Sequence, residues 1–148
     1  MGIVHGYRSG LEADAQRQLR AAGLPVIYEE FFIPWKLEKS CKYTPDFVLP
    51  NGIIVETKGR FVTADRQKHL YIKKQYPELD IRFVFSRSAS RISTTSKTTY
   101  AKWCQTKGFS YADAVIPQRW LDEPISTVSL ARVMMLFEEQ GKEFPACD

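Results

Sequence analysis

The stretch from Tyr43 to Gly59, which reads YTPDFVLPNGIIVETKG, constrains the fold of this chain more than any other part of it. Its first half is an apolar run that follows Pro45, a residue common at strand starts because it has no amide to donate. Pro50 and Gly52 interrupt that run, and a second apolar, β-branched run follows them. We expect a β-hairpin closed by a three-residue loop, in which a type I turn precedes a glycine with positive φ.

The length of this loop decides which side chains share a face of the hairpin. With three loop residues, Asp46 lies opposite Glu56, and Lys58 joins them two residues further along the same face. A two-residue Asn-Gly loop would instead place Asp46 opposite Thr57 and send the two carboxylates to different faces. We expect the three-residue form. Apolar residues on both sides of the second strand indicate that it is buried on both faces.

Two carboxylates at this separation repel each other, and one would take up a proton unless a cation lies between them. Oxygen ligands suit a hard divalent ion, so we expect one or two Mg²⁺ ions, or Mn²⁺ in their place, at Asp46 and Glu56. A lysine beside such an ion can orient or deprotonate an attacking water, which predicts phosphodiester hydrolysis with Lys58 in that role. The alternative is a solvated hairpin in which Glu56 merely pairs with Lys58, and the apolar surroundings argue against it.

Pro45-Asp46 and Glu56-Thr57-Lys58 match the two halves of the PD-(D/E)XK nuclease signature. The segments TPDFVLPNGIIVETKG and DRQKHLYIKKQYPELDIRFVFS, with RSGLE upstream, resemble phage endonuclease I, the T-seven type of Holliday junction resolvase, over residues 7–120. The resemblance implies an α/β, restriction-endonuclease-like core with a mixed central β-sheet flanked by helices. It also implies a metal-dependent, structure-selective DNA endonuclease that resolves branched junctions by paired nicks and works as an intertwined homodimer.

The resemblance also assigns roles to particular residues. Asp46 and Glu56 hold the metal, the carbonyl of Thr57 adds a ligand, and Lys58 assists the nucleophilic water. A glutamate in the RSGLE context, here Glu12, completes the acidic cluster from the other subunit and helps to hold an ion or the water. The residues themselves offer another interpretation, because Ser-Gly-Leu-Glu is a capping box at the start of a helix. We prefer the catalytic role for Glu12.

The remaining elements fit one nuclease domain over residues 1–148. The resemblance implies that residues 36–42 bridge the two subunits, and an ordinary surface loop is the alternative. A helix over 63–76 and a buried strand over 81–85 predict a βαβ crossover, and hence a mixed sheet. Residues 126–140 predict a further amphipathic helix. There the sequence departs from the family, because it ends in acidic residues where a basic tail is expected.

The net charge is +4, and it is unevenly distributed. Residues 1–107 carry 18 basic and 10 acidic side chains, a net of +8, whereas residues 108–148 carry 3 and 7, a net of −4. This asymmetry favours a polyanionic partner, here branched DNA. The loop 86–99, rich in serine, threonine and arginine, is expected to be mobile and to order against phosphates; a plain flexible loop is the alternative. The arginines predicted to contact DNA are Arg8, Arg60, Arg66, Arg87 and Arg91.

Other features limit the class of protein. The chain has no signal-like start and no apolar run long enough to cross a bilayer, so we expect a cytoplasmic protein with no membrane partner, in the host cytoplasm if a phage encodes it. Cys41, Cys104 and Cys147 are expected to be thiols, and His69 is expected to be exposed or half-buried. Two other functions stay open: a sequence-directed or mismatch-directed endonuclease with the same motif, and a junction-binding protein without catalysis.

Overall fold

The strand β2 (Ile53–Lys58) is the element on which the rest of the sheet is built, and its first four residues are buried. The computed structural model describes residues 10–25 and 41–144. Within them, the elements other than β2 are α1 (Gly10–Ala21), β1 (Phe47–Val48), α2 (Thr63–Gln75), β3 (Asp80–Phe85), α3 (Tyr100–Lys107), β4 (Tyr111–Asp113), α4 (Gln118–Leu121) and α5 (Thr127–Glu139).

The described strands form one mixed sheet in the order β1-β2-β3-β4. β1 runs antiparallel to β2, whereas β2, β3 and β4 are parallel to one another. The parallel neighbours β2 and β3 are joined through α2, as a βαβ crossover requires. The predicted α/β class and mixed sheet are therefore confirmed.

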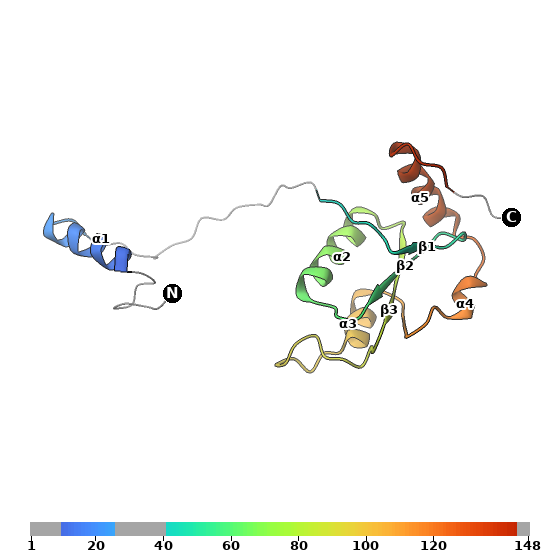
Figure 1. Ribbon diagram of the computed structural model, residues 1–148, viewed down its shortest axis with the longest axis horizontal. Coiled ribbons are helices and arrows are strands. Elements are labelled where there is room, and N and C mark those ends of the chain that lie inside the picture. The colour runs from blue at the N-terminus through green and yellow to red at the C-terminus, as the bar shows by residue number, and fades with distance from the viewer. Residues whose placement is uncertain (1–9, 26–40, 145–148) are drawn as a thin grey trace. The chain divides into compact units, whose positions relative to one another are not determined.

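Each face of the sheet has its own apolar core, because alternate residues of a strand point to opposite faces. Ile54, Phe83 and Phe85 lie in the larger core, with Trp103 of α3 and Val133 of α5. Figure 1 shows α2 and α3 on one side of β2 and β3, and α4 on the other.

The second core is smaller. Ile53, Val55 and Val84 pack there with Trp120 of α4, which is 3% exposed. The sequence-based expectation that β2 is buried on both faces is thus correct. A charged residue in such a strand needs a specific partner or a function, because burying an unpaired charge is costly.

The helix α2 begins where the polypeptide leaves the sheet. Val62 is its N-cap, and Thr63 is its first helical residue, so the helix starts without a side-chain cap. Instead, the guanidinium of Arg66 donates hydrogen bonds to the carbonyl of Phe61 and to the hydroxyl of Thr63 (3.1 Å for the latter). These contacts fix the turn that leads from β2 into α2.

The predicted C-terminal helix is confirmed as α5, and it packs against the hairpin loop. Ser126 caps it by accepting from the amide of Ser129. The fully buried hydroxyl of Ser129 donates to the carbonyl of Gly52 (2.6 Å) and accepts from the amide of Asp80 (3.1 Å). One serine therefore ties together the hairpin loop, the start of β3 and α5.

The loop 86–99 is hydrogen-bonded at both ends. The amide and hydroxyl of Ser88 both donate to the carboxylate of Asp113, at 2.6 and 2.9 Å. Ile92 donates its amide to the carbonyl of Thr98 (2.9 Å), which closes the loop on itself. Thr99 then caps α3. Several of the loop's polar groups thus bond within the chain, while its arginines stay exposed.

The chain divides into two compact units, residues 1–41 and 42–148. In the first, α1 ends at Ala21, and Gly23 follows it with a φ of +71° and an amide that donates to the carbonyl of Arg20, which closes the helix. The sheet and all later elements belong to the second unit. No helix in the described ranges has both the length and the apolar character that a bilayer crossing requires.

Candidate active site

The hairpin has the predicted three-residue loop. The amide of Leu49 donates to the carbonyl of Ile53 (2.7 Å), and the amide of Gly52 donates back to the carbonyl of Leu49 (2.9 Å). The φ of Gly52 is +94°, in the region that favours glycine. The register of β1 and β2 therefore places Asp46 opposite Glu56, as the sequence predicts.

Asn51 holds this loop in place from inside the protein. Its buried side-chain amide donates to the carbonyls of Trp120 (2.9 Å) and Glu123 (3.2 Å), and its side-chain oxygen accepts from the amide of Ile53 (3.2 Å). The loop and the α4 region are thereby connected. The register of the hairpin is thus fixed by tertiary contacts as well as by turn geometry.

Asp46 and Glu56, which we call the carboxylate pair, are joined through the backbone. The amide of Asp46 donates to Oε1 of Glu56 at 2.9 Å. Oδ2 of Asp46 accepts from both the amide (2.9 Å) and the hydroxyl (2.8 Å) of Thr57. Glu56 is buried, whereas Asp46 is exposed. The pair thus lies at the surface end of a buried strand, where a ligand can reach one member while the other is shielded.

The environment keeps Asp46 ionised. The hydrogen bond from the Thr57 amide lowers the pKa of the Asp46 carboxyl, and the Thr57 hydroxyl and the charges of Lys58 and Lys68 act in the same direction. Partial burial opposes them. Asp46 is therefore a carboxylate at neutral pH and is available to a cation.

Lys58 lies between two carboxylates. Its Nζ is 3.9 Å from Oε2 of Glu56 and 3.3 Å from Oδ1 of Asp65, so it is closer to Asp65. Asp65 was not among the residues predicted for the site. The signal was present, because Asp65 falls in the first turn of the helix expected after the hairpin, and that turn leaves the same end of the strand as Lys58.

Tyr43 and His69 form the buried side of the site. The ring of Tyr43 packs edge-on against His69, with centroids 5.0 Å apart, and Nζ of Lys68 lies 5.2 Å from the Tyr43 ring centroid. Burial and the neighbouring Glu56 carboxylate raise the pKa of the Tyr43 hydroxyl, which makes no hydrogen bond of normal geometry within the described residues. His69 is fully buried, so the prediction of an exposed or half-buried histidine was wrong.

The arginines predicted to contact DNA differ in their surroundings. Arg60, Arg87 and Arg91 are exposed, as a phosphate contact requires. Arg66 is buried, and its guanidinium donates to the carbonyl of Phe61 before α2 and to the hydroxyl of Thr63, the first residue of α2. The structure therefore favours a structural role for Arg66. Periodicity alone could not separate the buried and exposed faces of α2.

Some predicted residues lie outside the described part of the chain. Arg8 is one of them, and so is most of the expected bridge, of which only Cys41 and Lys42 are described. Glu12 falls within α1, but its side chain is not described. Their roles stay predictions.

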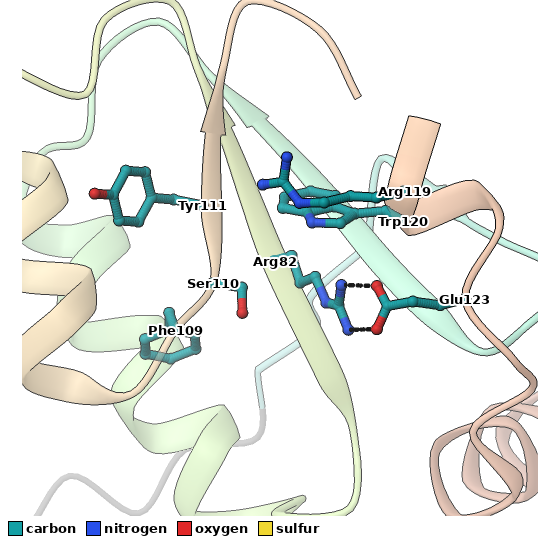
Figure 2. A pocket seen from close by; sticks show the side chains of 7 residues that line it. All are labelled: Arg82, Phe109, Ser110, Tyr111, Arg119, Trp120 and Glu123. Atoms are coloured by element: carbon teal, nitrogen blue, oxygen red, sulfur yellow. Dashed lines mark hydrogen bonds and ion pairs between the residues drawn. The ribbon is translucent and has the colours of Figure 1, made fainter. Parts of the chain in front are cut away.

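A separate depression of about 580 Å³ lies beside β3 and α4. Figure 2 shows Arg82 in it, paired with Glu123. Arg82 also pairs with Asp80 (2.8 Å) and lies 5.3 Å from the ring of Trp120. These carboxylates raise the pKa of Arg82, which stays protonated, and they balance its positive charge. Because Arg82 is in register with Val55, it extends from the sheet face opposite to the carboxylate pair.

Known proteins match most of this chain. The family model described as phage endonuclease I matches residues 1–140. The endonuclease I of Escherichia phage T7 is 46% identical over 131 residues, which are 88% of this chain and 88% of the relative. The endodeoxyribonuclease 1 of Enterobacteria phage T3 is 48% identical over 119 residues, 80% of this chain and 78% of the relative.

Proposed function

Because the chain belongs to the phage endonuclease I family, we propose that it resolves four-way and other branched DNA junctions by metal-dependent, paired nicks. The observation that carries the proposal is the carboxylate pair. The hairpin register brings Asp46 and Glu56 together at the end of a buried strand, 2.9 Å apart between the amide of one and the carboxylate of the other.

The residues present suit Mg²⁺ or Mn²⁺. The carboxylate pair offers oxygen ligands, which hard divalent ions prefer. Within residues 10–25 and 41–144, no group of three or more His, Cys, Asp or Glu side chains is gathered around one point. In one subunit the pair, the Thr57 carbonyl and water would form the ligand set, and membership of the family assigns the remaining acidic ligand to Glu12 of a second subunit.

Each residue of the site then has a distinct task. A bound ion supplies Lewis acidity at the scissile phosphate. Asp46, kept ionised by Thr57, and the shielded Glu56 bind that ion. Lys58 lies 3.9 Å from Glu56, where its ammonium group can orient the attacking water and offset the charge that develops on the phosphate.

The dimer is the second part of the proposal. Residues 36–42 pass between subunits, so that Glu12 of one chain completes the site of the other. Two such sites related by a two-fold axis cut opposing strands of a junction, which has matching symmetry. The exposed Arg60, Arg87 and Arg91, with Arg8, contact the phosphate backbone, and Arg66 stays outside this set. The enzyme acts on DNA in the host cytoplasm.

The test compares a labelled four-way junction with a linear duplex that carries the same arms, each with Mg²⁺ and with a chelator. We expect symmetric cleavage of the junction alone, and only with the metal ion. Equal cleavage of both substrates would favour a sequence-directed or general nuclease. Tight junction binding without cleavage would leave only a binding protein.

A mixing experiment tests the shared site. Chains carrying Glu12→Ala or Asp46→Ala are each expected to be inactive as homodimers. In a mixed dimer, one composite site combines an intact Glu12 with an intact Asp46, so a single nick per junction should return. No recovery after refolding the two chains together would contradict the exchange between subunits.

A further inference from the structure

We propose that Asp65 is a positioning residue of this site: its carboxylate holds the Lys58 ammonium group away from Glu56 and so leaves Glu56 available to the metal ion. The inference rests on the proposed function, because it concerns the same site. It assigns a role to a carboxylate that neither the nuclease signature nor the charge pattern singled out.

The distances carry the first step. Nζ of Lys58 is 3.3 Å from Asp65 and 3.9 Å from Glu56, so the ammonium group is within ion-pair distance of both but closer to Asp65. The side chains of Lys58 and Asp65 are 18% and 21% exposed, whereas that of Glu56 is 5% exposed. Lys58 is thus drawn toward the more solvated of its two partners.

The position of Asp65 is fixed independently of this ion pair. Four residues separate the end of β2 from α2, and Phe61 among them is almost fully buried. The amide of Phe61 donates to the hydroxyl of Tyr100 (3.2 Å), and its carbonyl accepts from the guanidinium of Arg66. Asp65 lies in the first turn of α2, where the helix dipole stabilises a negative charge. The turn therefore holds the Asp65 carboxylate near Lys58 whether or not the ion pair forms.

The electrostatic consequence follows from removing that partner. Without the Asp65 charge, the nearest carboxylate to the Lys58 ammonium group among residues 10–25 and 41–144 is that of Glu56. A charge pair attracts more strongly where water is excluded, and Glu56 is the buried partner. Lys58 would then occupy Oε2 of Glu56 and compete with a divalent ion for it. Asp65 prevents this competition, and Lys58 stays beside the ion rather than in its place.

The experiment measures Mn²⁺ binding to the full-length protein by titration calorimetry, without DNA. We expect Asp65→Asn to weaken Mn²⁺ binding about 10- to 100-fold, the usual effect of removing an outer partner of a metal site. Lys58→Ala alone should bind Mn²⁺ about as the wild type does. The double variant Asp65→Asn/Lys58→Ala should recover wild-type binding, because the competing ammonium group is gone.

Two controls separate positioning from a general effect. Asp122→Asn removes the same charge from an exposed residue of the α4 region, whose carboxylate accepts a hydrogen bond from the side chain of Gln118, and it should leave Mn²⁺ binding unchanged. Asp65→Glu keeps the charge and should retain most of the wild-type affinity for Mn²⁺.

Each of the other outcomes overturns the proposal. Wild-type affinity in Asp65→Asn would show that Lys58 does not compete. Equal losses in Asp65→Asn and in the double variant would show that Asp65 acts on the fold or binds the ion itself. Absence of Mn²⁺ binding in the wild type would defeat the proposed function first, and this inference with it.

Discussion

The buried His69 gives a prediction about stability and pH that can be worked out in detail. Neither ring nitrogen has a hydrogen-bond partner among the described residues, and the ring is surrounded edge-on by Tyr43, Phe83 and Phe109. Burial, with smaller contributions from the charges of Lys68 and Lys58, lowers the pKa of His69 from 6.5 to about 4, while Asp65 opposes the change. The folded protein therefore holds a neutral imidazole well below neutral pH.

The sign and size follow from proton linkage. Well above pH 6.5, His69 is neutral in both states and its titration contributes almost nothing. Between pH 6.5 and 4, the unfolded chain binds a proton that the folded protein does not bind, so the free energy of unfolding falls as the pH falls. Each pKa unit corresponds to about 1.4 kcal/mol, and the difference from 6.5 to about 4 therefore limits this loss to roughly 3 kcal/mol.

The assay is urea unfolding of the wild type and of His69→Leu at several pH values, followed by the fluorescence of the buried Trp103 and Trp120. Leucine removes the titrating group and an unpartnered polar side chain, so at pH 7.5 the variant should be within about 1 kcal/mol of the wild type. At pH 4.5 the variant should have gained about 2.5 kcal/mol relative to the wild type. Parallel curves for the two proteins would refute the reasoning, because the carboxylates titrate in both.

Three further predictions concern the packing around the hairpin. Ser129→Ala leaves the carbonyl of Gly52 and the amide of Asp80 without their partner, and should lower the free energy of unfolding by about 2–4 kcal/mol in urea titrations. Gly52→Ala places a Cβ 2.8 Å from a backbone nitrogen of α5 at a φ of +94°, and should cost about 2 kcal/mol or more; an unchanged denaturation midpoint would contradict the contact. Burial raises the pKa of the Cys104 thiol to about 12, so a thiol reagent at pH 8 should leave it unlabelled in the folded protein and label it in urea, as peptide mapping by mass spectrometry would reveal.

The local parts of the site were predictable because local residues determine them. Pro50 and Gly52 select the loop, the loop selects the register, and the register brings Asp46 and Glu56 together. The helix and strand after the hairpin were equally predictable, because Pro77 ends the helix and an apolar run over 81–85 follows it. They predicted the crossover that makes β3 parallel to β2.

Contacts between distant residues could not be predicted in this way. The bonds from Asn51 to the carbonyls of Trp120 and Glu123 join residues that lie 69 and 72 positions apart. The burial of Arg66 could not be predicted either, because a sequence does not reveal which face of α2 is covered. The short strand β4 lacks an apolar run long enough to predict it.

The roles of Lys58 and Thr57 illustrate the intermediate case. The signature identifies both residues, but only the structure shows which atoms each of them contacts. The hydroxyl and amide of Thr57 donate hydrogen bonds to Asp46, and the ammonium group of Lys58 lies closer to Asp65 than to Glu56. Such details depend on side-chain geometry at the end of the strand, which residue spacing does not specify.

The central proposal is that the carboxylate pair is the site of metal-dependent junction cleavage. Its most direct test is the single-turnover rate at which Asp46→Asn cleaves a four-way junction in Mg²⁺. The substitution keeps the size of the side chain and removes the charge that is proposed to bind the ion, and Asp122→Asn serves as the charge-matched control. The account predicts a fall of at least about 100-fold for Asp46→Asn, with junction affinity retained, and an unchanged rate for the control. An undiminished rate in Asp46→Asn would contradict it.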